Sequence, residues 1–269
     1  MKREKSLLDH PWINQRRVFT TQEAGKALGW SDADLHATIF RLVEKGRLIR
    51  IKRGLFCLVP PGSSRFKKGY PQNWFLIAKA LTEGESYYVS YYSAMHLHGM
   101  TSQSIQTIFV TLPKQRRVPA NLQIPIRFVT VSREKLWGLE DKWVSNEEKV
   151  SISNLERTVL DILDRPDLAG GISEIARGLW LVKKNIDMLR LVSYATRFDS
   201  VAAVKRLGFL MEQLRLGPRE IGEQLKKIVE NSKSFALLDP TSGNQGPYLG
   251  KWHLRINVEM AQILDNLVT

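Results

Sequence analysis

Residues 21–59 read TQEAGKALGWSDADLHATIFRLVEKGRLIRIKRGLFCLV, in the order short helix, tight turn, second helix and basic hairpin. Thr20 or Thr21 can cap the first helix, and Gly29 supplies its stop. Ser31 followed by Asp34 is a variant of the capping box, so it predicts the start of the second helix. This order predicts a winged helix-turn-helix at the N-terminus.

The second helix has two distinct faces. The apolar spacing turns one set of side chains inward: Leu35, Ile39, Leu42 and Val43. The opposite set faces outward: His36, Ala37, Phe40 and Arg41. Ser31, Asp32 and Ala33 stand at the N-terminal end, which is the part that meets base edges in helix-turn-helix docking. Asp32 and Asp34 count against base contact because acids repel phosphate, although Asp can accept from cytosine.

The hairpin follows at once, with residues 47–52 as one strand, Arg53-Gly54 as the turn and residues 55–59 as the return. Arg50, Lys52 and Arg53 therefore cluster near its tip. Cations in this position suit phosphate contact, because each neutralised phosphate releases counterions whatever the base sequence. The alternative is a small helical subdomain with a solvated basic edge, which explains the helices but not the basic tip.

The net charge is +13 over 269 residues, and residues 1–120 carry +11 of it. A basic N-terminal half implies a polyanionic partner, and the predicted module inside it favours double-stranded DNA. Cys57 is the only cysteine, which excludes an internal disulfide and fits a reducing compartment. No stretch has the apolar length of a signal peptide or a membrane span, so we expect a cytoplasmic protein.

Residues 60–73, PPGSSRFKKGYPQN, have the composition of a linker or an exposed loop. We therefore expect a winged domain over residues 1–60, a basic linker over 61–73 and a C-terminal domain over 74–269. Additional phosphate contacts are expected from two basic segments: Arg65, Lys67 and Lys68 in the linker, and Lys114, Arg116 and Arg117 in a loop. For the linker, a solvated basic segment is an equal alternative.

The C-terminal part shows strand patterns before helix patterns. Strands are expected over 105–112, 124–131 and 143–152, with a last strand or extended stretch over 251–257. Helices are expected over 74–81, over Ala94 to Met100, over 153–163 with Ser153 as cap, and over 172–183, 185–196, 199–216 and 218–231. Strands followed by helices predict an α+β fold for the larger domain.

Candidate catalytic residues are few. His96 and His98 point to different faces of a helix, so they are poorly placed to share a metal ion. Glu156, Asp161, Asp164 and Asp167 form an acidic cluster of the kind that can hold magnesium, but a helix start and a turn explain the same positions. Phosphate-cradling glycine loops and nucleophile motifs are absent from the sequence. We therefore predict no catalytic, cofactor or metal site, with a nucleic-acid-processing enzyme acting through Glu156 and Asp161 as the alternative.

Four stretches carry a resemblance to a known family: LVEKGRLIRIKRGLFCLVP at 42–60, YYVSYYSAMHLHGM at 87–100, ISNLERTVLDILDRPDLAGGISEIARGL at 152–179 and VKRLGFLMEQL at 204–214. Together they resemble the AbiEi-type antitoxins of bacterial type IV toxin-antitoxin systems, which are also transcriptional regulators. The third stretch is the most specific, because a helix ending in D-R-P-D-L-A-G-G is not a generic pattern.

The resemblance implies a winged domain that binds inverted repeats upstream of its own operon, and a C-terminal domain required for antitoxicity. It also implies a nucleotidyltransferase-like toxin that is countered without a stable complex. The expected DNA-binding residues are Thr21, Ser31, Asp32, Ala33, His36, Arg41, Arg50, Lys52 and Arg53. A plain operon regulator without a toxin partner is a further alternative.

Overall fold

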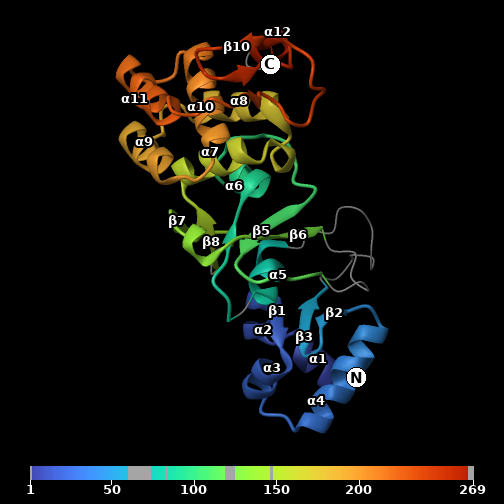
Figure 1. The fold of residues 1–269 in the computed structure, drawn as a ribbon. Coiled ribbons are helices and arrows are strands. Elements are labelled where there is room, and N and C mark those ends of the chain that lie inside the picture. The colour runs from blue at the N-terminus through green and yellow to red at the C-terminus, as the bar shows by residue number, and fades with distance from the viewer. Residues whose placement is uncertain (1, 60–73, 83, 119–124, 146–147, 266–269) are drawn as a thin grey trace.

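The computed structural model describes residues 2–59, 74–82, 84–118, 125–145 and 148–265. A small winged module occupies one end of the molecule, a five-stranded sheet lies in the middle, and a group of helices forms the other end (Figure 1). The predicted linker, residues 61–73, lies outside the described residues.

The N-terminal module is a winged helix-turn-helix, as predicted. Its elements are α1 (Lys2–Leu8), α2 (Pro11–Arg16), β1 (Val18–Thr20), α3 (Thr21–Leu28), α4 (Asp32–Glu44), β2 (Leu48–Lys52) and β3 (Leu55–Leu58). The three strands pair in the order β1-β3-β2. The predicted inner stripe of α4 is buried at Leu35, Ile39 and Leu42, and it packs with Leu7 and Ile13 from the first two helices.

The middle sheet is mixed and has the strand order β6-β5-β4-β8-β7. Its strands are β4 (Tyr88–Val89), β5 (Ile108–Leu112), β6 (Ile126–Thr130), β7 (Leu139–Trp143) and β8 (Lys149–Ser153). Two helices and a 3-10 turn belong to the same part of the chain: α5 (Trp74–Leu81), α6 (Tyr91–Leu97) and η1 (Arg133–Lys135). Tyr88 and Tyr91 are buried, so the aromatic run 87–92 contributes to the core.

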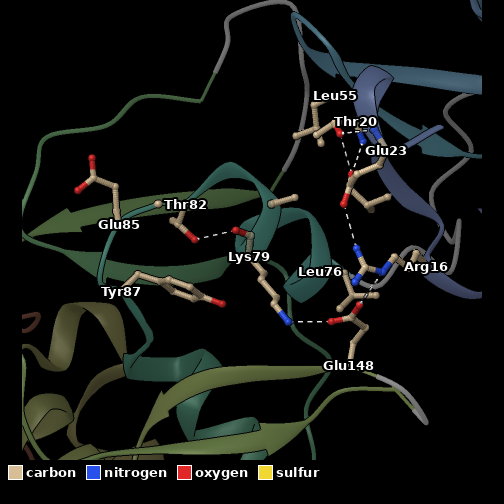
Figure 2. A pocket seen from close by; sticks show the side chains of 13 residues that line it. Arg16, Thr20, Glu23, Leu55, Leu76, Lys79, Thr82, Glu85, Tyr87 and Glu148 are labelled. Atoms are coloured by element: carbon tan, nitrogen blue, oxygen red, sulfur yellow. Dashed lines mark hydrogen bonds and ion pairs between the residues drawn. The ribbon is translucent and has the colours of Figure 1, made fainter. Parts of the chain in front are cut away.

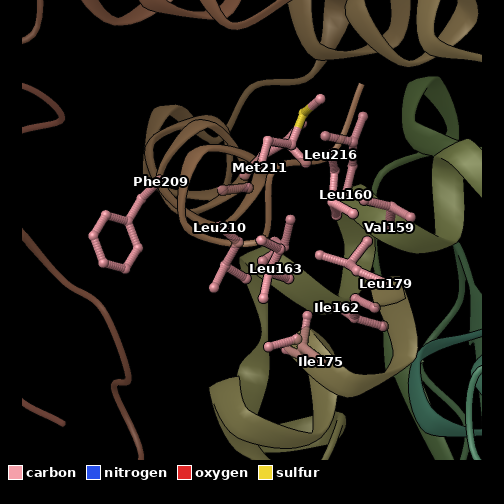
Figure 3. Close-up of a cluster of buried hydrophobic side chains, with 14 of the residues drawn as sticks. Val159, Leu160, Ile162, Leu163, Ile175, Leu179, Phe209, Leu210, Met211 and Leu216 are labelled. Atoms are coloured by element: carbon pink, nitrogen blue, oxygen red, sulfur yellow. The ribbon is translucent and has the colours of Figure 1, made fainter. Parts of the chain in front are cut away.

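The helical end contains the largest apolar cluster, part of which is drawn in Figure 3. Its elements are α7 (Leu155–Asp164), η2 (Pro166–Leu168), α8 (Gly171–Val182), α9 (Met188–Arg197), α10 (Val201–Gln213), α11 (Arg219–Val229), β9 (Ala236–Leu237), β10 (Tyr248–Leu249), β11 (Leu254–Arg255) and α12 (Met260–Asp265). Gly208 in α10 leaves room for Trp252, since a Cβ there would lie 2.1 Å from the indole ring. Strands followed by helices confirm the α+β class.

Three local predictions were wrong. The single strand expected over 143–152 is a hairpin of β7 and β8, because Val144 and Ser145 donate backbone hydrogen bonds to the Glu148 carbonyl and turn the chain. Asn154, not Ser153, caps α7, and Ser153 ends β8 instead. The extended stretch expected over 251–257 is a strand only at Leu254–Arg255.

The winged module and the middle sheet share an apolar cluster. Ile51, Leu55 and Cys57 from the wing strands are buried in the same cluster as Ile77 of α5 and Val110 of β5. Burial raises the pKa of the Cys57 thiol to about 12, so the thiol stays protonated and poorly reactive. The outer face of the wing sheet therefore packs against the C-terminal part of the chain.

Candidate nucleic-acid interface

The helix-turn-helix is fixed by hydrogen bonds at both ends of the turn. Thr20 and Glu23 form a complete capping box at the start of α3, and Gly29 ends that helix in the left-handed conformation with φ 65°. Ser31 caps α4, because its hydroxyl accepts from the Asp34 backbone N–H at 3.3 Å. The two helices are therefore oriented by local sequence, and α4 follows the turn with its N-terminal end exposed.

The outward face of α4 is open to solvent. The exposed side chains are Ser31, Asp32, Ala33, His36, Ala37, Phe40 and Arg41. Phe40 is 67% exposed, so its ring is accessible from outside. Ala33, Ala37 and Phe40 follow the helical spacing along one line, of which only Ala33 was in the predicted DNA-binding set. The outward orientation of Phe40 was the sequence signal that could have included it.

Helix α1 neutralises part of the acidic charge near α4. Arg3 forms an ion pair with Asp34, and the Ser31 hydroxyl donates to the Asp34 carboxylate at 2.9 Å. The Ser31 hydrogen bond, assisted by Arg3, lowers the pKa of Asp34. Because Asp34 is already paired within the module, its charge opposes phosphate less than the sequence alone suggests.

Two basic residues of α4 and its C-cap meet the same carboxylate. Lys45 forms an ion pair with Glu4 at 2.7 Å, and Arg41 approaches Glu4 at 3.8 Å. The hydrogen bond from Lys45 lowers the pKa of Glu4. The Arg41 side chain is 53% exposed, so it remains accessible from outside despite this contact.

The wing carries its cations at the tip, next to the start of α3. The Thr21 backbone N–H donates to the Gly54 carbonyl at 2.9 Å, and the Thr21 hydroxyl donates to the same carbonyl at 3.3 Å. Arg50 and Arg53 are exposed and Lys52 is half-buried. None of these three cations forms an ion pair with a residue that the structure describes, so all three are available to an external anion.

The second group of predicted phosphate contacts divides into three cases. Arg65, Lys67 and Lys68 lie outside the described residues. Lys114 and Arg116 both approach the Glu85 carboxylate, at 3.3 and 3.9 Å, and Arg116 also donates to the Leu81 carbonyl. Arg117 is exposed. The structure thus gives Lys114 and Arg116 an internal acidic partner.

Residues 12–59, which hold most of this interface, match the model of a protein family described as "Transcriptional regulator, AbiEi antitoxin". The chain carries an AbiEi-type transcriptional regulator domain. No curated protein matches the chain significantly. Among solved structures, the RV2827C protein from Mycobacterium tuberculosis is similar to this chain, with a TM-score of 0.66 and 14% identity over 98% of this chain and 95% of that one. At this identity the likeness shows the fold alone, and it extends over both ends of the molecule.

A cleft of about 240 Å³ lies between the AbiEi domain and the rest of the chain (Figure 2). Arg16 of α2 forms ion pairs with Glu23 at 2.9 Å and with Glu148 at 3.7 Å. Lys79 of α5 reaches the same Glu148 at 2.7 Å. Glu148 therefore links a cation of the AbiEi domain to a cation of the C-terminal part.

Two of the four acidic candidates from the sequence, Glu156 and Asp161, have different partners in the helical end of the molecule. Glu156 accepts from the Asp187 backbone N–H at 2.9 Å, while Asp161 pairs with Arg157 at 2.8 Å. His98 donates to the Ser153 carbonyl at 2.7 Å, which gives this ring a role in joining α6 to the sheet.

Within the described residues, no helix combines the length and apolar character that a membrane crossing needs.

Proposed function

We propose that this AbiEi-type regulator is an autorepressor that binds inverted repeats in double-stranded DNA upstream of its own operon. The observation that carries the proposal is the exposed face of α4 beside three wing cations, Arg50, Lys52 and Arg53, that have no ion-pair partner among the described residues. Cations at the wing suit phosphate, which positions the module, while α4 suits the major groove, where bases are distinguished.

Base reading is assigned to the outward face of α4. His36 and Arg41 supply donors for base edges, and Ala33, Ala37 and Phe40 suit the thymine methyl group. Because Asp34 is already paired with Arg3, Asp32 is the acid that remains at the exposed end of the helix. A carboxylate there suits the N4 amino group of cytosine. Ser31 and Thr21 supply hydroxyl groups near the backbone.

The antitoxin role belongs to the proposal as well. In this view residues 1–60 bind DNA, residues 61–73 form the linker, and residues 74–269 carry the activity that counters a nucleotidyltransferase-like toxin without a stable complex. The protein acts in the cytoplasm by binding and not by catalysis. The family of the matched domain supports this assignment. Co-expression with the protein encoded by the adjacent gene separates it from a regulator without a toxin.

The first test is fluorescence-anisotropy titration of the full chain with its own upstream DNA and with a scrambled duplex, each at two salt concentrations. We expect tight binding to the upstream DNA that exceeds binding to the scrambled duplex at both salt concentrations. Equal and strongly salt-dependent binding to both duplexes would contradict the repressor, because it would reduce the winged module to a nonspecific electrostatic anchor.

A further inference from the structure

A second cavity lies in the C-terminal part of the chain, far from the exposed face of α4 in the sequence. It has a volume of about 470 Å³, which lies within the usual range for small-molecule sites. Its walls come from α7, from Tyr88 of β4, from the start of α6, from residues 131–137 and from residues 197–200. We call it the Asp161 pocket.

The Asp161 carboxylate in this pocket lacks one hydrogen bond. Asp161 is 3% exposed, and its Oδ1 accepts from the Arg157 Nε at 2.8 Å. Its Oδ2 is buried and has no hydrogen-bond partner among the described residues. Buried carboxylate oxygens are almost always hydrogen-bonded. A ligand in the pocket that carries a hydrogen-bond donor would satisfy this oxygen.

The two guanidinium groups in the pocket, those of Arg157 and Arg197, contact aromatic rings and other acceptors. Arg157 lies 4.2 Å from the centre of the Trp137 ring and donates to the Trp137 carbonyl at 3.3 Å. Its other terminal nitrogen donates to the Tyr88 hydroxyl at 3.4 Å. Arg197 lies 4.4 Å from the same Trp137 ring. The aromatic surroundings thus already accommodate two cations, as cation–π attraction favours.

The charge balance of the lining favours another cation. Four acidic residues line the pocket, Glu134, Asp161, Asp164 and Asp199, against three basic ones, Lys135, Arg157 and Arg197. Arg157 pairs with Asp161, and Lys135 pairs with Asp199 at 3.5 Å. Glu134 and Asp164 form no ion pair within the described part of the chain. An anionic ligand would meet both of these carboxylates.

The backbone at the pocket is also unusual. Tyr91, at the first position of α6, has φ 51°, a left-handed conformation that is rare for an aromatic residue. Such strained positions concentrate at ligand-binding sites, because the surrounding structure must hold them in place. The Tyr91 side chain is buried and forms part of the pocket wall.

We propose that the Asp161 pocket binds a small organic cation with N–H donors, an amine or a guanidine, whose charged end donates to the free Oδ2 of Asp161. Glu134 and Asp164 attract the cation, and the aromatic side chains of Trp137 and Phe198 accompany its apolar part. This site is independent of the DNA-binding role, because it shares no residue with α4 or the wing.

Binding at this site should depend on pH. Burial raises the pKa of Asp161 to about 6, against the opposing effects of Arg157 and of the Tyr88 hydroxyl that faces the same carboxylate. The other titratable or charged groups around it are Tyr88 on β4, Tyr91 on α6, Glu134 and Lys135 on η1, Asp164 on α7, and Arg197 and Asp199 at the end of α9. Below its pKa the Asp161 carboxyl is neutral and no longer attracts a cation. We therefore expect the affinity to rise roughly tenfold between pH 5 and pH 7.

The test is calorimetric titration of the full chain with two cationic probes, agmatine and putrescine, and with butyrate as an anionic probe. We expect saturable binding of at least one cation and none of butyrate. Glu134→Gln and Asp164→Asn should each weaken cation binding roughly two- to fivefold. Glu140→Gln, an exposed carboxylate outside the pocket, is the matched control and should leave the affinity unchanged.

Asp161→Asn should weaken cation binding by more than about tenfold, because it removes a charged acceptor. Thermal unfolding checks that this variant folds, and if it does not, Glu134→Gln and Asp164→Asn decide the matter. The proposal is overturned by the absence of saturable binding of both cations, by equal binding of butyrate, or by equal effects of the Glu134 and Glu140 substitutions.

Discussion

The cations of the wing and the cations of the helical end are the same chemical groups in opposite surroundings. Arg50 and Arg53 stand in solvent without an ion-pair partner among the described residues. Lys205 is 1% exposed and donates to the Ser232 hydroxyl at 2.8 Å, and Arg206 donates to the Leu163 carbonyl at 2.7 Å. Burial lowers the pKa of both Lys205 and Arg206. The buried hydrogen bonds must therefore stabilise the charged forms of these two side chains. The cations that we assign to DNA contact are solvated, whereas the cations that stabilise the fold are buried and donate hydrogen bonds to acceptors in the same chain.

The strongest test of this difference is Arg157→Leu. Loss of the guanidinium leaves the buried Asp161 without its ion-pair partner, so we expect the free energy of unfolding to fall by about 3–5 kcal/mol. Chemical denaturation measures it. Arg219→Leu, in which the lost side chain is 90% exposed, should change stability by no more than about 0.5 kcal/mol. Similar losses in both variants would remove the distinction between buried and solvated cations.

The triple variant Arg50→Ala, Lys52→Ala and Arg53→Ala tests the solvated cations of the wing. We expect weaker binding to all duplexes and a salt slope reduced by up to about 0.9 for each lost phosphate contact. Stability should not change measurably. The matched control replaces three exposed cations of α11, Arg219, Lys226 and Lys227, with Ala. An unchanged slope in the wing variant, or an equal reduction in the control, would make the wing assignment wrong.

Phe40→Ala and His36→Ala test the uncharged part of the interface. Both side chains are exposed, so the free energy of unfolding should not change. The difference in binding free energy between the correct and a wrong base pair should fall by about 1–3 kcal/mol where the side chain makes a good base contact. The measurement is competition binding against operators with single base-pair changes. A uniform loss over all duplexes would mean that these side chains do not read bases.

Glu148→Gln should have the smallest effect. Glu148 bridges Arg16 and Lys79, but both cations are close to half exposed, so solvent screens the pairs. We expect a loss of less than about 1 kcal/mol in the free energy of unfolding, and a smaller loss at high salt. A loss as large as that of Arg157→Leu would place Glu148 among the structural charges of the core.

Local sequence was sufficient to predict an element when the residues of that element determine its start, its end and its buried face. The Thr20–Glu23 box, Gly29 and the apolar stripe of α4 predict the helix-turn-helix, because caps and periodicity act within a few residues. The two-residue strand β4 could not be predicted, since it exists only by pairing with β5 and β8. The β7–β8 hairpin was missed because β7 contains three charged residues in a row, 140–142, and therefore has a weak strand pattern.

The interface was predictable in outline for the same reason. Exposed and buried sides of α4 follow from its period, and the basic tip follows from the hairpin turn. The pairs Arg3–Asp34, Lys45–Glu4 and Lys114–Glu85 were not predictable, because their partners lie 31, 41 and 29 residues apart. Such contacts decide which charges remain free, and only the tertiary structure brings the partners together.

The apolar cluster shared by the wing and the C-terminal part has a consequence for truncation. A fragment ending at residue 60 would present Ile51, Leu55 and Cys57 to water on one face of its three-stranded sheet. An exposed apolar face next to strand edges favours self-association, and the exposed thiol would gain the reactivity that burial denies it. The isolated module should therefore aggregate and cross-link under oxidising conditions, whereas the full chain protects the same surface.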